Sequence, residues 1–190
     1  MTIVDEQSDG FDTLYRLDYP NQEVQISLNR GLLQHLGKTV AEATDQGRTL
    51  CGLLTANDFE GFAETLRAYL AGIPYQWHAT GDLARHEAWY AGLLHMCFRA
   101  IGVDARSEEA SSRGRADMVA LTGGQVFVFE FKMAETAGEA EAALEAALAR
   151  MRDRGYAEKH RDRKEPVHLV AVACGREARN LLDIRVELFK

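Results

Sequence analysis

The stretch GRADMVALTGGQVFVFEFK, residues 114–132, decides the fold of this chain. Val126 to Phe129 form a continuous apolar run, which is typical of a strand that is buried on both faces of a sheet. The run leads directly into Glu130, and Lys132 follows two residues later. Alternate residues of a strand share one face, so these two charged side chains are expected to point the same way.

A partner strand is predicted just before this run, at about residues 115–121. The pair Gly123-Gly124 between the two runs is a strong signal for a two-residue hairpin turn. Counting back through such a turn sets Asp117 directly opposite Glu130. Two carboxylates in that position repel each other, and a divalent cation between them would relieve the repulsion. The other interpretation is structural, with Arg115 and Lys132 holding the two carboxylates apart at the rim of the sheet.

This pattern favours metal-assisted hydrolysis of phosphodiesters. Carboxylates such as Asp117 and Glu130 are hard ligands that suit Mg²⁺ or Mn²⁺. A bound ion lowers the pKa of a water ligand and neutralises charge in the transition state. Lys132 beside it would orient the attacking water or stabilise the charged phosphate. The pattern is moderately specific by itself, and its position on two paired strands strengthens it.

A third carboxylate candidate, Glu87, lies on a predicted helix before the sheet. It falls on the apolar stripe that includes Tyr90, Leu94 and Phe98, and a carboxylate on a buried stripe needs a partner. Glu87 would complete the metal site from the helix. The alternative is a surface glutamate paired with a nearby base such as Arg85.

The composition fits a globular chain of modest size. Its 190 residues suit one medium domain or two small ones, and a hydrophobic fraction of 46% is enough for a substantial core. No apolar segment has the length that a membrane span needs, and the polar N-terminus lacks the features of a signal peptide. The three cysteines lie far apart among apolar residues, which indicates free thiols in a reducing cytoplasm. They are Cys51, Cys97 and Cys174.

The net charge of −7 is distributed unevenly along the chain. Residues 1–80 carry 11 acidic and 5 basic side chains, whereas residues 81–190 carry 18 and 17. Within the second part, seven basic side chains cluster between residues 150 and 164. Such a cluster either follows a phosphate backbone or is a solvated helix end. Its members are Arg150, Arg152, Arg154, Lys159, Arg161, Arg163 and Lys164.

The first 74 residues read as a small, mostly helical module or connector. A short strand is expected at 11–19, followed by helices at about 22–36 and 38–54. A third helix, capped by Asn57 or Asp58, ends at residues 72–74. The sequence of this part has no group of residues in a catalytic or metal-binding pattern, which suggests a structural role.

From residue 75 onward the pattern predicts a second domain that ends at residue 190. A helix capped by Asp82 extends to about Ile101, and strands follow at 103–110, 115–121 and 125–132. A helix at 137–155 carries one continuous apolar stripe, and a buried strand at 167–173 precedes an edge strand at 181–189. This order indicates an α/β sandwich with a mixed sheet.

Four residues are candidates for contacts with nucleic acid: Arg115, Arg150, Tyr156 and Lys159. Arg115 would grip a phosphate if it lies opposite Lys132, or would otherwise pair with a glutamate at the strand rim. Tyr156 would bond a phosphate or stack on a base, although core packing is the simpler role for it. Lys159 belongs to the basic cluster next to Tyr156.

These residues together resemble the PD-(D/E)XK nuclease superfamily. The resemblance is carried by Glu87, by GRAD with Asp117, by FEFK with Glu130 and Lys132, and by an Ala-rich helix ending in GYAEKH. It covers about residues 73–190. The chain is more narrowly similar to bacterial proteins in which an AAA-ATPase-like region precedes such a nuclease domain, and YPNQEV (residues 19–24) resembles their connector. No ATPase motif is present, so the resemblance implies a fragment or a shortened member, with a possible ATPase domain or partner elsewhere.

The resemblance implies a restriction-endonuclease-like αβββαβ core and a Mg²⁺- or Mn²⁺-dependent nuclease that acts on DNA. The implied metal ligands are Asp117, Glu130 and Glu87, with Lys132 assisting catalysis. Two departures stand out: Ala116 replaces the proline of the motif, and Arg150 occupies a helix position that often carries a glutamine facing the site. A catalytically silent nucleic-acid-binding or regulatory module with the same fold is the alternative.

Overall fold

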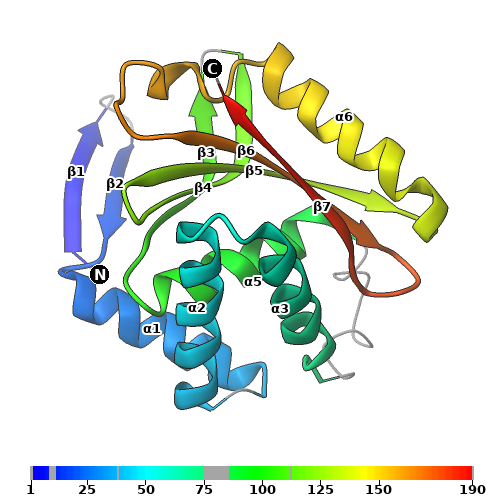
Figure 1. Ribbon diagram of the computed structural model, residues 1–190. Coiled ribbons are helices and arrows are strands. Elements are labelled where there is room, and N and C mark those ends of the chain that lie inside the picture. The colour runs from blue at the N-terminus through cyan, green and yellow to red at the C-terminus, as the bar shows by residue number, and fades with distance from the viewer. Residues whose placement is uncertain (1, 9–11, 38, 75–85, 112, 190) are drawn as a thin grey trace.

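The computed structural model describes residues 2–8, 12–37, 39–74, 86–111 and 113–189. Its centre is a five-stranded mixed sheet in the order β3-β4-β5-β6-β7, in which β5 and β6 are parallel and the other neighbours are antiparallel. Helices cover both faces of this sheet (Figure 1). None of the helices in the described ranges is long and apolar enough to cross a membrane.

The second part of the chain has the predicted restriction-endonuclease-like order of helix, three strands, helix and strand. The edge strand predicted at 181–189 is also confirmed, as β7. The elements are α5 (Glu87–Arg99), β3 (Asp104–Ser111), β4 (Gly114–Thr122), β5 (Gln125–Ala134), η2 (Ala137–Glu139), α6 (Ala140–Asp153), η3 (Glu158–His160), β6 (Val167–Gly175) and β7 (Asn180–Phe189). The predicted start of the first of these helices, at Asp82, lies outside the described residues.

The hairpin of β4 and β5 has the predicted turn and register. Gly123 and Gly124 have φ of 58° and 71°, the conformation in which glycine is favoured over residues with a side chain. The strands then pair in register from Thr122–Gln125 to Met118–Phe129. This register places every even-numbered residue of β5 from Val126 on one face and every odd-numbered one on the other.

Each face of the sheet has its own apolar core. Phe127, Phe129 and Phe131 face α1, α2, α3 and α5, whereas Val126 and Val128 face α6. Figure 1 shows α6 on one side of the sheet and α2, α3 and α5 on the other. Because both faces are covered, the strands in the middle of the sheet are apolar along most of their length, as the sequence predicts.

The first part of the chain contributes three helices to the same core. They are α1 (Gln22–His35), α2 (Val40–Thr55) and α3 (Phe59–Ala71). Their N-caps are Asn21, Thr39 and Asp58, each with a side chain that accepts a hydrogen bond from the first turn. Leu50 and Phe62 are fully buried in the cluster that includes Phe129 of the sheet. The domain boundary predicted near residue 74 stays a prediction.

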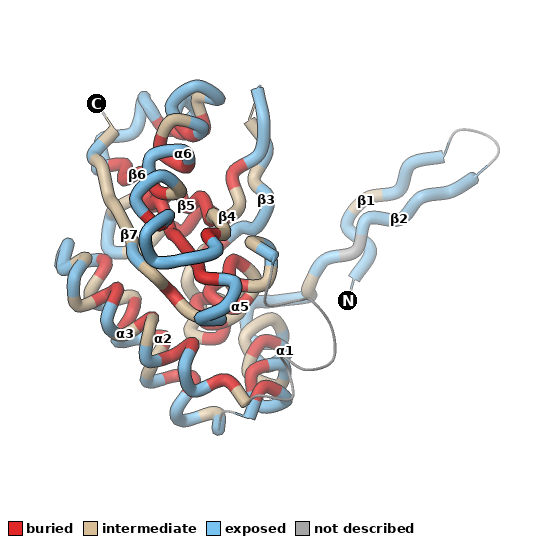
Figure 2. The backbone as a smooth tube through the Cα atoms, turned by 90° about the vertical axis from the view of Figure 1, so that its right-hand side faces the viewer, coloured by how far each residue is buried: buried red, intermediate tan, exposed pale blue. Residues whose placement is uncertain are grey.

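A two-stranded hairpin precedes these helices. Strands β1 (Thr2–Ser8) and β2 (Thr13–Asp18) pair with each other only and project from the body of the molecule (Figure 2). The strand predicted at 11–19 corresponds to β2. The polar N-terminus gives no sequence signal for β1, whose seven residues are almost all exposed.

Candidate active site

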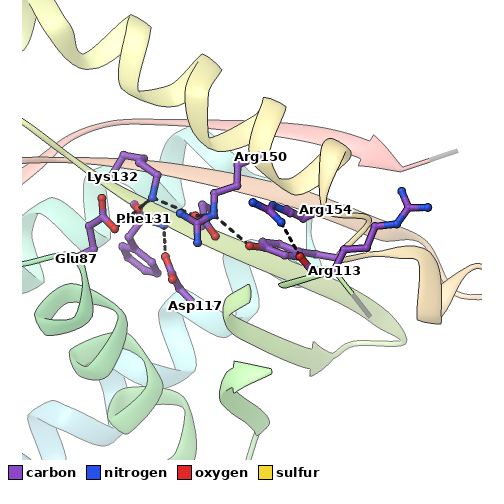
Figure 3. Close-up of polar contacts among 9 residues, drawn as sticks. Glu87, Arg113, Asp117, Phe131, Lys132, Arg150 and Arg154 are labelled. Carbon is purple, nitrogen blue, oxygen red and sulfur yellow. Dashed lines mark hydrogen bonds and ion pairs between the residues drawn. The ribbon is translucent and has the colours of Figure 1, made fainter. Parts of the chain in front are cut away.

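The candidate site lies where β4 and β5 separate. Their ladder ends at Met118–Phe129, after which β4 continues beside β3 and β5 continues beside β6. Asp117 and Glu130 are therefore the first residues beyond the last ladder pair. The N–H of Phe131 donates to Asp117 Oδ2 at 2.8 Å, so this carboxylate replaces the lost ladder partner. Figure 3 shows Asp117 reaching across to β5 at this point.

Lys132 of β5 connects this strand to α5 through its hydrogen bonds. Its Nζ donates to Glu130 Oε1 at 3.0 Å, to Glu87 Oε2 at 3.2 Å and to the carbonyl of Phe131 at 2.8 Å. All three N–H bonds of the ammonium group thus have acceptors. Glu87 is the first residue of α5, and its side chain is 38% exposed. The structure therefore brings the four residues predicted for catalysis into one cluster.

Glu130 is the most buried charged group of the cluster, with no exposed surface. Its Oε1 also lies 3.0 Å from Arg150 Nε, on the face of the sheet that α6 covers. Its Oε2 is buried and has no hydrogen-bond partner among the described residues. A buried carboxylate oxygen without a partner is unfavourable, which marks this atom as one that a ligand would satisfy.

The electrostatics of the two carboxylates agree with this geometry. Burial raises the pKa of Asp117, against the opposing effects of the Phe131 N–H and Lys132. Burial also raises the pKa of Glu130, and the nearby charge of Asp117 raises it further. Burial alone would lower the pKa of Lys132, but its hydrogen bond to Glu130 and the charges of Glu130 and Glu87 raise it overall.

The donor set fits a hard divalent cation. The carboxylates of Asp117 and Glu130 are close enough for the charge of Asp117 to raise the pKa of Glu130. Oε2 of Glu130 accepts no hydrogen bond from the described residues, so it is available to a cation. Mg²⁺ typically takes one or two protein carboxylates and completes its shell with water and phosphate oxygens. The described residues contain no group of three or more His, Cys, Asp or Glu side chains arranged around one point. Glu87 contacts Lys132 through Oε2, and its predicted role as a metal ligand stays a prediction.

Arg150 and Tyr156 form a second layer behind Glu130. Arg150 Nε donates to the phenol oxygen of Tyr156 at 3.1 Å, and this bond is the main cause of the raised pKa of Arg150. Tyr156 is 1% exposed and packs against Gly114, where an added Cβ would lie 3.0 Å from the ring. A ring so deeply buried cannot stack on a base, so core packing, the simpler role, is the one observed.

Two other predicted nucleic-acid contacts lie apart from the cluster. Arg115 faces Ala110 of β3 and pairs with Glu108 at 3.1 Å, which is the rim arrangement that the sequence left open. Its side chain does not lie opposite Lys132, because β4 has already left β5 at that level. Lys159 contacts Glu109 at 2.5 Å and the carbonyl of Ala110 at 3.0 Å.

Much of the basic cluster at residues 150–164 is neutralised within the molecule. Arg152 contacts Glu187, and Arg161 contacts Glu158 at 2.7 Å and lies over the ring of Phe189. Arg154 donates to the carbonyl of Arg113 at 3.0 Å, as Figure 3 shows. The contacts of Arg152 and Arg154 tie the end of α6 to β7 and to the connection between β3 and β4. Of the two interpretations of the cluster, a solvated helix end fits these residues better than a surface that binds a phosphate backbone.

Two contacts in the site have no clear signal in the sequence. The bond from Phe131 N–H to Asp117 depends on where β4 leaves β5, and the hairpin pattern does not reveal that point. The pairing of Arg150 with both Glu130 and Tyr156 depends on how α6 crosses the sheet. The resemblance places Arg150 at a helix position that faces the site, but the six-residue spacing from Arg150 to Tyr156 is too common to predict their contact.

Comparisons with known proteins agree with this arrangement. A family model described as the PD-(D/E)XK nuclease superfamily matches residues 85–183, just over half of the chain. An "uncharacterized protein in vnfD 5'region" of Azotobacter chroococcum mcd 1 is 40% identical over 187 residues, which cover 98% of this chain and 35% of that relative. The chain therefore spans about a third of the length of the relative. No solved structure matches the chain.

Proposed function

Because the chain belongs to the PD-(D/E)XK nuclease superfamily, we propose that it is a nuclease that hydrolyses phosphodiester bonds in DNA, with Mg²⁺ or Mn²⁺ as its cofactor. One observation carries the proposal: Asp117, Glu130 and Lys132 meet at the point where β4 and β5 separate, and Glu130 presents a buried oxygen without a partner among the described residues. Few structural roles account for a charged group in that position.

Each residue of the cluster has a distinct role in this proposal. Asp117 and Glu130 would hold the cation, which would supply an activated water and neutralise charge on the phosphate. The ammonium group of Lys132 would orient the attacking water or stabilise a phosphate oxygen. Glu87 holds Lys132 in place through the 3.2 Å contact and is a positioning residue.

The cellular setting is also part of the proposal. No disulfide joins the three described cysteines, and two of them are buried, as expected in a reducing cytoplasm. The relative from Azotobacter chroococcum is about three times as long as the aligned region. This difference is compatible with an ATPase domain or partner that acts together with the nuclease domain.

The test is a cleavage assay with labelled DNA and RNA in Mg²⁺, in Mn²⁺ and in a chelator. We expect cleavage of DNA with either metal, none with the chelator, and none by Asp117→Asn. Glu108→Gln, which removes an exposed β3 carboxylate outside the cluster, should cleave as the wild type does. Cleavage that survives the chelator or the Asp117→Asn change would contradict the proposal.

A second function is favoured by two contacts of Glu130. Lys132 and Arg150 both contact Oε1 of Glu130, so the carboxylate already has two cationic partners. Such a network is compatible with a catalytically silent nucleic-acid-binding module that keeps the fold. That alternative predicts binding of DNA without cleavage under all of these conditions, and equal binding by wild type and Asp117→Asn.

A further inference from the structure

Arg150 is the one cation of the site that comes from α6. Its Nε lies 3.0 Å from Glu130 Oε1, and its side chain is half exposed, whereas Lys132 is 18% exposed. Figure 3 shows Arg150 reaching from α6 to the strand that carries Glu130. Arg150 is therefore the more accessible of the two cations that balance the buried carboxylate.

The Nε atom of Arg150 has two close partners, a hydrogen-bond acceptor in Tyr156 and an ion-pair partner in Glu130. Nε lies 3.0 Å from Glu130 Oε1 and 3.1 Å from the phenol oxygen of Tyr156. The phenol is fixed, because Tyr156 is 1% exposed and packed in the core under α6. Arg150 can therefore give up Glu130 and keep a hydrogen bond to Tyr156. The arrangement lowers the free energy needed to release the carboxylate.

The rest of the guanidinium group remains available. Neither Nη of Arg150 bonds a side chain or carbonyl in the described part of the chain, and together they carry four N–H donors in a planar fork. A planar fork of this kind matches two oxygens of a phosphodiester. The donors lie beside the carboxylate where the proposed cation would bind.

The positive charge of Arg150 disfavours binding of the divalent cation and favours binding of the phosphodiester. Three carboxylates (Glu87, Asp117, Glu130) and two cations (Lys132, Arg150) leave one excess negative charge. Without Arg150 the excess would be two, which would favour a divalent cation more strongly. With the cation bound, Arg150 makes the site more attractive to a phosphodiester anion.

We infer that Arg150 couples the two ligands: it competes with the divalent cation for Glu130 in the free protein, and it moves to the phosphodiester when substrate binds. Metal affinity is then low in the free protein and rises when substrate is present. By linkage, the metal raises the affinity for substrate by the same factor. This inference rests on the proposed function of the site, and it assigns Arg150 a role in substrate-dependent metal loading.

The test measures Mn²⁺ affinity by electron paramagnetic resonance or calorimetry, without reference to cleavage. Wild type is titrated alone, with a phosphorothioate-linked DNA duplex that resists cleavage, and with a methylphosphonate-linked duplex that lacks backbone charge. We expect the charged duplex to raise Mn²⁺ affinity about tenfold, within the range of about 5–150-fold typical of coupled sites. The neutral duplex should have little effect.

Arg150→Gln gives the decisive comparison. It should bind Mn²⁺ several-fold more tightly than wild type without DNA, and its gain from the charged duplex should shrink. Tyr156→Phe removes the hydrogen-bond acceptor of Nε and leaves the ion pair with Glu130, so it should bind Mn²⁺ more weakly than wild type. Arg152→Gln is the matched control, because it removes a cation of the same helix that pairs with Glu187, and it should behave as wild type.

The outcomes separate this inference from the proposed function. Unchanged or weaker Mn²⁺ binding by Arg150→Gln, with an undiminished gain from the charged duplex, would overturn the coupling while the metal site stands. Absence of Mn²⁺ binding at millimolar concentration in wild type and in Arg150→Gln would overturn both. If Arg150→Gln melts far below wild type, Arg150→Lys replaces it: with its charge kept and its fork lost, it should bind Mn²⁺ nearly as wild type but gain less from the charged duplex.

Discussion

Strand β5 has an apolar half, residues 126–129, and a charged half, residues 130–132. From Val126 to Phe129 every side chain is apolar and fully buried, and every residue pairs with both β4 and β6. From Glu130 to Lys132 the strand pairs with β6 alone, and two of the three residues are charged. The first half stabilises the fold, whereas the second holds a buried charge with an unpaired oxygen. The difference shows that the site exists because β4 stops pairing with β5 at Asp117 while it continues beside β3.

The apolar half should dominate stability. Phe129 lies in the core shared with Phe62 of α3, at 6.4 Å between ring centroids, and has no exposed surface. Phe129→Ala should lower the free energy of unfolding by about 3–5 kcal/mol. Chemical denaturation measures it, with Leu188→Ala as the control, because Leu188 is 54% exposed. A loss below about 1 kcal/mol for Phe129→Ala would show that this half does not carry the core.

The charged half should dominate activity. Lys132→Met removes the ammonium group that contacts Glu130 and Glu87, and it should lower the rate of DNA cleavage about 10²–10³-fold, the typical effect of losing one donor to a transition state. Steady-state cleavage rates measure the effect. Lys159→Met, which removes a lysine paired with Glu109 away from the site, is the control. Equal rates for the two variants would refute a catalytic role for Lys132.

The two halves should also differ in their response to pH. Burial, together with the charge of Asp117, raises the pKa of Glu130 in the folded protein above its ordinary value of 4.5. The folded state then binds this proton more tightly than the unfolded state, so the stabilisation is complete below pH 4.5 and is lost as the pH rises through the folded pKa.

Glu130→Gln cannot lose that proton. Without metal, its melting temperature minus that of wild type should therefore increase as the pH rises above 4.5, and then level off. Burial lowers the pKa values of His95, His160 and His168, which act with the opposite sign, but these histidines are common to both proteins and cancel in the difference. Thermal melts across pH in a chelator measure it. A difference that falls with pH would mean that Glu130 is stabilised as a carboxylate.

The smallest effect is expected outside the strand, in the basic cluster. Arg152 and Arg161 are held by Glu187 and Glu158, whereas Arg163 has no ion-pair partner among the residues described. Replacing all three by Ala should reduce the salt slope of DNA binding by about 1, the value for one phosphate contact, and not by about 3. Binding titrations at several salt concentrations measure the slope. A reduction near 3 would show that the ion pairs open when DNA binds.

The sequence predicts most of the fold because its strongest signals are local. The run Val126–Phe129 and the turn at Gly123-Gly124 determine the register of β4 and β5, and Thr39 and Asp58 mark the starts of their helices. The same local signals bring Asp117, Glu130 and Lys132 together. Contacts between distant elements are not encoded in this way, so the rim position of Arg115 and the Arg150–Tyr156 bond emerge only in three dimensions.

The melting temperature in millimolar Mg²⁺ or Mn²⁺, relative to that in a chelator, tests whether the charged half of β5 is a cation site. A ligand that binds only the folded state stabilises it by about 2.7 kcal/mol at a hundred times its Kd. Wild type should melt at a clearly higher temperature with metal, and Asp117→Asn and Glu130→Gln should not. No shift in wild type, or the same shift in all three proteins, would contradict a metal site at Asp117 and Glu130.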